Sequence, residues 1–174
     1  MEAILDASFW NAAFGPRVEA YLPRLFRVVA PPLVRSEVLT DSIRGRGNFP
    51  NAETFRLWEF ASLLVVAGPT TPWSSALGPE RFQNKGEQGV IALAYERGAI
   101  ALINEVAAIN FAKQTGLPVL DVPGWIVLLA HNKLIPMGAA WSGLKRLEEM
   151  GRVSPALTGA ARSALEALAK GGWQ

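Results

Sequence analysis

Apolar residues occur along this chain in two alternating patterns. Short continuous runs, typical of buried strands, lie at residues 2–5, 26–30, 63–67, 99–103 and 117–120. Segments with the 3.6-residue spacing of amphipathic helices lie at residues 17–26, 51–61, 86–97, 105–115, 136–150 and 154–170. Strands that alternate with helices are typical of βαβ units, so the pattern predicts an α/β fold with a central, mainly parallel sheet.

Single residues predict further helices and several helix ends. Pro31-Pro32 opens a short helix, because proline suits a first helical turn, and an apolar helix ends near His131. Ser154 stands where the last helix needs an N-cap. Gly116 and Gly151 follow predicted helix ends, where glycine adopts the left-handed conformation that ends many helices.

Residues 40–85 have a weaker pattern than the rest of the chain. Residues 41–48 are polar and glycine-rich, and residues 68–85 contain prolines at positions 69, 72 and 79, so both segments are predicted to be loops. The chain has 174 residues, which suits one domain with a sizeable core. We therefore expect a single domain over residues 1–174 with a variable insertion at about 40–85.

Composition excludes several classes of protein. Half of the residues are hydrophobic and 18% are charged, as in compact folded proteins rather than disordered ones. No apolar stretch approaches the roughly 20 residues that span a bilayer, so no membrane partner is expected. No basic region precedes the first apolar run, which argues against a signal peptide and favours a cytoplasmic location. The net charge of +2 allows a polyanionic partner but gives no basic tail.

The side chains available for metal binding are almost all oxygen donors. The chain has no cysteine, which excludes disulfides and thiolate sites, and its one histidine, His131, excludes a zinc site with several imidazoles. Any bound metal must therefore be held by oxygen atoms, which favours Mg²⁺ or Mn²⁺.

Acidic and amide side chains directly follow three of the predicted strands. Asp6 follows the first strand, Asn104 and Glu105 follow the strand at 99–103, and Asp121 follows the strand at 117–120. In a parallel sheet the carboxyl ends of the strands meet at one edge, where ligands bind. We therefore expect these side chains to share one cleft.

Two further acids occupy helical positions that could face the same cleft. Glu37 shares the inward face of its helix with Val34, and Glu87 lies in the first turn of an apolar helix. Each residue also has a structural explanation, such as an N-cap for Asn104 or Asp121, a frayed helix end for Glu37 or a favourable helix dipole for Glu87. Together, however, several carboxylates would repel one another unless a divalent cation bound them. Carboxylate clusters that bind such a cation activate water for phosphodiester cleavage.

The chain resembles the PIN-domain family, in particular its VapC-like toxin nucleases. The matching segments occur in family order and cover most of the chain outside about 40–85. They are Ile4-Leu5-Asp6-Ala7-Ser8, residues 28–38 (VVAPPLVRSEV), residues 86–94 (GEQGVIALA), Ala101-Leu102-Ile103-Asn104-Glu105 running through Ala112 to residues 116–119 (GLPV), and Gly124 with the apolar helix after it.

The resemblance implies a three-layer α/β/α sandwich and a Mg²⁺- or Mn²⁺-dependent ribonuclease. It further implies RNA as substrate, a small cognate antitoxin protein that holds the toxin inactive, and a homodimer. The catalytic acids that it implies are Asp6, Glu37, Glu87 and Glu105, of which Asp6, Glu87 and Glu105 bind the metal. Ser8 matches a position whose hydroxyl supports the first aspartate, and Asn104 belongs to the matching acidic pair.

The sequence departs from the family pattern at three places. Asn104 stands where the family usually has aspartate, and its amide oxygen brings no charge to a metal. Ile109 stands where an arginine is common, and Asp121-Val122 replaces a common Gly-Thr pair. The resemblance leaves two ways to complete the ligands, with Glu105 as the fourth ligand or with Asp121 restoring the lost charge.

Other residues have both a functional and a structural interpretation. Arg44 and Arg46 could bind RNA phosphates, because the guanidinium group matches phosphate geometry, but a solvated loop is the favoured interpretation. His131 is expected to cap a helix rather than act as a base. The chain has six tryptophans, whose rings could stack on the bases of RNA. Helical patterns nevertheless predict core positions for Trp58, Trp125 and Trp141 and leave Trp10 and Trp73 as loop residues.

Two other functions compete with the nuclease. A catalytically weakened PIN-like module would bind RNA or a protein through the same cleft, and the departures at Asn104 and Ile109 favour it. A hydrolase of the acid-phosphatase type would use Asp6 as its nucleophile. That chemistry normally needs a second aspartate two residues later, where this chain has Ser8.

Overall fold

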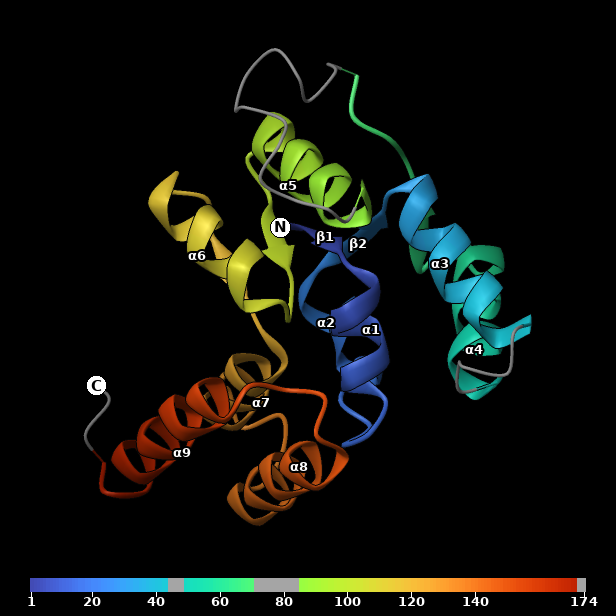
Figure 1. Cartoon of the computed structure of the whole chain (residues 1–174). Coiled ribbons are helices and arrows are strands. Elements are labelled where there is room, and N and C mark those ends of the chain that lie inside the picture. The colour runs from blue at the N-terminus through green and yellow to red at the C-terminus, as the bar shows by residue number, and fades with distance from the viewer. Residues whose placement is uncertain (44–48, 71–84, 172–174) are drawn as a thin grey trace.

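The computed structural model of the chain describes residues 1–43, 49–70 and 85–171 (Figure 1). Arg44 and Arg46, with their predicted RNA contacts, and Trp73, with its predicted loop position, lie outside the described residues. In the part of the chain that is described, no helix has the length and the apolar character needed to cross a membrane.

A parallel sheet forms the centre of the molecule. In the described residues its strands follow the order β3-β2-β1-β4-β5, and every pair of neighbours is parallel, as predicted. The register places Ile4 opposite Val29 on one side and Ala101 on the other. The strands are β1 (Glu2–Leu5), β2 (Arg27–Ala30), β3 (Leu64–Val66), β4 (Ile100–Leu102) and β5 (Val119–Leu120).

Helices cover both faces of this sheet (Figure 1). Since βαβ crossovers are right-handed, the connections from β1 to β3 and those from β3 to β5 lie on opposite faces. The three-layer α/β/α sandwich is therefore confirmed. The helices along these connections are α1 (Ala7–Ala13), a 3₁₀ turn η1 (Glu19–Tyr21), α2 (Leu22–Leu25), α3 (Pro32–Ile43), α4 (Phe49–Phe60), α5 (Lys85–Arg97) and α6 (Val106–Gln114).

Continuous burial of the central strands explains their continuous apolar runs. Ile4, Val28 and Val29 are completely buried because helices cover both faces of the sheet. Trp125 is completely buried as predicted, and Trp58 also belongs to the core. Trp141 is partly buried and packs against the same core.

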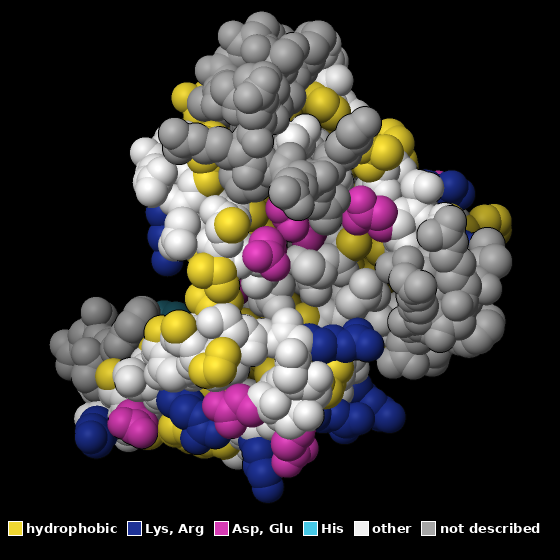
Figure 2. Space-filling model, in the orientation of Figure 1, with side chains coloured by type: hydrophobic (Ala, Val, Ile, Leu, Met, Phe, Trp, Pro, Cys, Tyr) yellow, Lys and Arg dark blue, Asp and Glu magenta, His cyan; other side chains and the backbone are white. Residues whose placement is uncertain are grey.

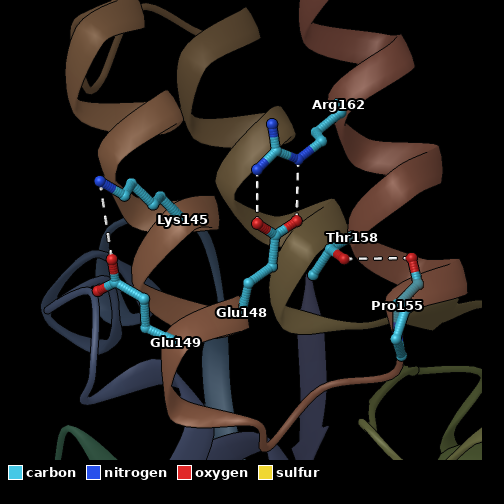
Figure 3. A network of polar contacts seen from close by, with 6 residues as sticks. All are labelled: Lys145, Glu148, Glu149, Pro155, Thr158 and Arg162. Carbon is cyan, nitrogen blue, oxygen red and sulfur yellow. Dashed lines mark hydrogen bonds and ion pairs between the residues drawn. The ribbon is translucent and has the colours of Figure 1, made fainter.

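The chain continues after β5 into three helices that pack on one another (Figure 1). Helix α7 also contacts α1, which joins this helical unit to the sheet layer. Arg162 Nε and Nη2 donate to the two carboxylate oxygens of Glu148 at 2.8 and 2.5 Å, and Thr158 Oγ1 donates to the Pro155 carbonyl at 3.2 Å (Figure 3). The helices are α7 (Val122–His131), α8 (Met137–Met150) and α9 (Pro155–Ala169).

Four of the predicted helix ends are confirmed. Ser154 Oγ accepts a hydrogen bond from the Ala156 backbone N–H at 3.3 Å, so Ser154 is the N-cap of α9. Gly116 and Gly151 have φ angles of 71° and 62°, the left-handed conformation expected of glycines that end helices. His131 is the last residue of α7, so its predicted place at a helix end is also confirmed.

Helix α1 was not predicted, and Trp10 is not a loop residue. Trp10 lies inside α1 and is completely buried. Its ring forms edge-on contacts with Phe14, Phe55 and Trp58 at centroid distances of 5.0, 5.5 and 5.1 Å. Its indole N–H donates to the Asn51 carbonyl at 3.1 Å. This environment leaves Trp10 unavailable for stacking on a base.

Two other predictions of local structure are wrong. The segment 17–26 is not one helix, because Arg17 has a φ of 60° and Phe26 is extended, and only η1 and α2 are helical within it. Helix α3 runs as far as Ile43, so residues 41–43 are helical and not part of the loop predicted at 41–48, whose other residues lie outside the described part of the chain.

Candidate functional site

Asp6 lies at the carboxyl edge of the sheet, between the end of β1 and the start of α1. Its backbone N–H donates to the Leu102 carbonyl at 3.0 Å, which extends the pairing with β4 by one residue. Its side chain is the N-cap of α1, because Oδ2 accepts the Ser8 backbone N–H at 2.9 Å. The Ser8 hydroxyl donates to the same oxygen. Ser8 therefore fixes the orientation of the Asp6 carboxylate.

The other carboxylate oxygen of Asp6 has no hydrogen-bond partner among the described residues. Asp6 is 2% exposed, and its Oδ1 is buried without a hydrogen bond from any described residue. Burial raises the pKa of Asp6 strongly enough to outweigh the hydrogen bonds from Ser8 and Ala7, and the nearby carboxylate of Glu105 raises this pKa further. A buried acid with an unpartnered oxygen and an acidic neighbour provides a favourable place for a cation.

Glu105 reaches this site from the end of β4. It occupies the N-cap position of α6, but its side chain makes no capping hydrogen bond. The expectation that Asn104 could be the N-cap is wrong, because α6 begins at Val106 and Asn104 lies one residue too early. The carboxylate of Glu105 is exposed on the carboxyl edge of the sheet, near Asp6.

Glu37 and the start of α5 meet at the same edge. Helix α3 begins directly after β2, where the parallel strands end, and the first turn of α5 lies beside it. A Cβ atom added to Gly86 would lie 2.6 Å from Glu37 Oε1 and 2.9 Å from Oε2. Glu87 comes next in the first turn of α5 and is 8% exposed. Figure 2 shows acidic side chains gathered near the centre of this face, between α3, α5 and α6.

The amide of Asn104 is engaged by backbone groups. Its Oδ1 accepts the Val122 N–H at 3.2 Å, and its Nδ2 donates to the Arg152 carbonyl at 3.4 Å. Its backbone N–H donates to Ser8 Oγ at 3.3 Å. An aspartate could not donate to a carbonyl oxygen, so asparagine is the residue that joins the end of β4 to both α7 and the loop after α8.

Asp121 also has a structural role. It is the N-cap of α7, since its Oδ1 accepts the Gly124 backbone N–H at 2.6 Å, as one interpretation of the sequence predicted. Burial raises its pKa. Asp121 borders a pocket of about 380 Å³ between α7 and α9 whose lining includes neither Asp6 nor Glu105.

The donor atoms at the sheet edge suit a hard divalent cation, but they are not gathered into one tight cluster. Within residues 1–43, 49–70 and 85–171, no three histidine, aspartate or glutamate side chains lie close enough together to hold a metal ion. The acids instead form two groups at the same edge, Asp6 with Glu105 and Glu37 beside the first turn of α5. The unpartnered oxygen of Asp6 is the feature that fits Mg²⁺ or Mn²⁺ best.

Two residues of this region had no predicted role. Gly86 has no side chain and so leaves the space that the Glu37 carboxylate occupies. The sequence signal that could have indicated this role is a glycine in the first turn of a helix. Arg152 reaches the site through its contact with Asn104, across 48 positions of the sequence, and no local pattern indicates that contact.

Comparison with known proteins finds similarity to solved structures. No protein-family model matches the sequence, and no curated protein matches it. The chain is similar in structure to a PilT N-terminus (PIN) domain protein, SSO1118, from the hyperthermophilic archaeon Sulfolobus solfataricus P2. The two share 15% sequence identity over 72% of this chain and 90% of that chain, with a TM-score of 0.46.

Proposed function

We propose that this chain is a PIN-like ribonuclease that depends on Mg²⁺ or Mn²⁺. Asp6 and Glu105 are the proposed metal ligands, and Glu37 and Glu87, which form the second acidic group at the same edge, complete the acidic site. A bound divalent ion supplies activated water and stabilises the departing oxygen in phosphodiester cleavage. The observation that carries the proposal is the buried, unpartnered oxygen of Asp6 beside Glu105.

The position of the acids in the fold supports this proposal. Ligands of open parallel α/β sheets bind outside the carboxyl ends of the strands, and Asp6 directly follows the central strand β1. Glu105 follows the neighbouring strand β4 after two intervening residues, Ile103 and Asn104. The ordered sequence resemblance to PIN domains supports a nuclease rather than another metal-dependent hydrolase.

The first test is cleavage of single-stranded RNA by the purified chain. We expect a labelled RNA to be cut internally in Mn²⁺ or Mg²⁺ and to remain intact in EDTA. The protein must be free of any co-purifying partner, because the proposed antitoxin would mask activity. Absence of cleavage in both metals, by protein that is monodisperse and folded, would contradict the nuclease.

Gly86→Ala is expected to impair cleavage at little cost in stability. The added methyl group would lie 2.6 Å from Glu37 Oε1, so the flexible carboxylate must move away. Gly138→Ala is the matched control, since the same methyl group on α8 meets no atom within 4 Å. We expect reduced cleavage only for Gly86→Ala, measured alongside thermal unfolding. Equal RNA cleavage by the two variants would contradict a role of Glu37 in the site.

The second candidate is a non-catalytic module that binds RNA or protein at the same edge. Two observations favour it: the amide of Asn104 is occupied by backbone contacts, and the described acids do not form a group of three. Calorimetric titration with Mn²⁺ separates the candidates. The nuclease predicts binding that is lost in Asp6→Asn, and the module predicts no binding that depends on a carboxylate.

We further propose that the chain is the toxin of a toxin–antitoxin pair, active in the cytoplasm and self-associating as a homodimer. An apolar surface at the end of α4 and the approach to β3 supports a protein partner. Leu57, Phe60 and Leu63 are 59%, 91% and 45% exposed there. Light scattering during gel filtration tests the homodimer, which a monomer at micromolar concentration would contradict.

A further inference from the structure

The loop between α8 and α9 is attached to the acidic edge of the sheet. Asn104 Nδ2, at the end of β4, donates to the Arg152 carbonyl at 3.4 Å. Val153 is 8% exposed, which anchors the same loop in the core. The Asn104 backbone N–H donates to Ser8 Oγ, and that hydroxyl donates to Asp6. The backbone of Arg152 is therefore connected to the buried Asp6 carboxylate through two residues.

The guanidinium group of Arg152 is held only weakly by the protein. Nη1 lies 3.5 Å from the Asn11 carbonyl, at the limit of a hydrogen bond, and the residue is exposed. In the part of the chain that the structure describes, Arg152 forms no ion pair. Arg162, by contrast, is held by both carboxylate oxygens of Glu148. Most of the donors of Arg152 thus remain available to a ligand.

The chemistry of this position suits a phosphate group. A carboxylate cluster repels a polyanionic strand, so binding of RNA requires positive charge next to the acids. Figure 2 shows basic side chains on the side of the acidic region that faces the C-terminal helices. A guanidinium group on an anchored loop can donate two parallel hydrogen bonds to phosphate oxygens, and such contacts fix the position of a strand without reading its sequence.

We propose that Arg152 binds a backbone phosphate of single-stranded RNA and so positions the strand across the carboxyl edge of the sheet. This inference rests on the proposed function, because it assigns the RNA-binding group of the same site. It gives the C-terminal helical unit a role in substrate binding, since α8 and α9 carry the loop that presents Arg152.

The test measures RNA binding in EDTA, where no cleavage occurs. A fluorescein-labelled single-stranded RNA is titrated with the wild type, Arg152→Gln, Arg152→Lys and Arg27→Gln at several salt concentrations, and fluorescence anisotropy is recorded. Arg27→Gln is the control for the loss of one surface charge, because Arg27 begins β2 at the opposite edge of the sheet, where its 68% exposed side chain pairs with Glu2 Oε1 at 3.3 Å.

We expect Arg152→Gln to weaken binding about three- to tenfold, as for the loss of one hydrogen-bonded contact. The slope of log K against log salt should become shallower by about 0.7, the value for one phosphate contact with a single strand. Arg152→Lys should keep the wild-type slope, since the charge remains. Arg27→Gln should match the wild type.

Three outcomes would overturn the inference. Weaker binding by Arg152→Gln with an unchanged salt slope would mean that the substitution acts only through the protein structure. Equal loss in Arg152→Gln and Arg27→Gln would mean non-specific attraction by surface charge. If the wild type cleaves RNA and Arg152→Gln leaves both RNA affinity and KM unchanged, the inference fails while the nuclease stands. If RNA binding depends on Arg152 but the wild type cleaves no RNA in Mn²⁺, the nuclease proposal fails while the inference about Arg152 stands.

Discussion

Replacing Asp6 with asparagine is expected to reduce metal-dependent RNA cleavage by at least about 10²- to 10³-fold, the usual cost of removing one preorganised charged group from an active site. The substitution removes the negative charge and alters little else. Asparagine ranks with aspartate as an N-cap, so α1 keeps the hydrogen bond from the Ser8 N–H. Loss of activity would therefore report on the charge of Asp6 rather than on the start of the helix.

The same substitution is expected to make the metal-free protein more stable at neutral pH. Burial raises the pKa of Asp6 above its ordinary value of 3.8, so the folded state holds this proton more tightly than the unfolded chain. The stability that the proton contributes is complete below pH 3.8 and is lost as the pH rises through the higher pKa of the folded state. Asparagine carries no such proton and avoids this loss.

The measurement is a pair of experiments on wild type and Asp6→Asn. Thermal unfolding in EDTA from about pH 4 to about pH 7 should show a steeper decline for the wild type than for the variant, which keeps only the contribution of other buried acids such as Asp121. Addition of Mn²⁺ at neutral pH should raise the melting temperature of the wild type alone, because a ligand stabilises the state that binds it. A variant that still cleaves RNA at the wild-type rate would eliminate Asp6 from the proposed site.

The sheet could be predicted from the sequence because burial on both faces leaves a continuous apolar signal. Strands such as 2–5 and 99–103 stand out for that reason, and the residues that follow them must lie at one edge of a parallel sheet. This reasoning predicts that Asp6 and Glu105 lie at the same edge, and the structure has each of them shortly after the end of its strand.

Helix α1 could not be predicted by the same approach, since it is buried nearly all round. Residues 7–13 include five buried positions, so they lack the polar face that reveals an amphipathic helix. At residues 17–26, by contrast, the apolar spacing predicts one continuous helix that the structure does not have. Val18 and Leu22 are buried as the spacing indicated, but Pro23 and the extended Phe26 limit the backbone to one short helical turn after η1.

The site depends on contacts between segments that are far apart in the sequence, and no local sequence pattern predicts such contacts. Asn104 meets Arg152 across 48 positions, and Glu37 meets Gly86 because two helices start at the same edge. The sequence alone marked Asn104 as a departure from the acidic pattern. The structure supplies the physical reason, since only an amide can both accept from the Val122 N–H and donate to the Arg152 carbonyl.

Trp10→Ala is expected to cause the largest loss of stability among these substitutions, about 3–5 kcal/mol. The indole is completely buried, packs edge-on against Phe14, Phe55 and Trp58, and donates to the Asn51 carbonyl. Its removal leaves a cavity and an unsatisfied carbonyl in the contact between α1 and α4. Since domains of this kind have about 5–15 kcal/mol of total stability, the variant should be close to unfolding at physiological temperature.

Urea unfolding of Trp10→Ala, Trp10→Phe and Trp141→Ala tests this expectation. Trp10→Phe keeps most of the ring contacts and loses the N–H donor, so it should cost only about 1–2 kcal/mol. Trp141 is partly buried, and its replacement should cost less than that of Trp10. Because Asp6 caps α1 and Trp10 lies one turn later, loss of this packing should also increase hydrogen exchange in both α1 and α4. A loss below about 1 kcal/mol for Trp10→Ala would mean that the aromatic cluster does not hold α4 against the helix that positions Asp6.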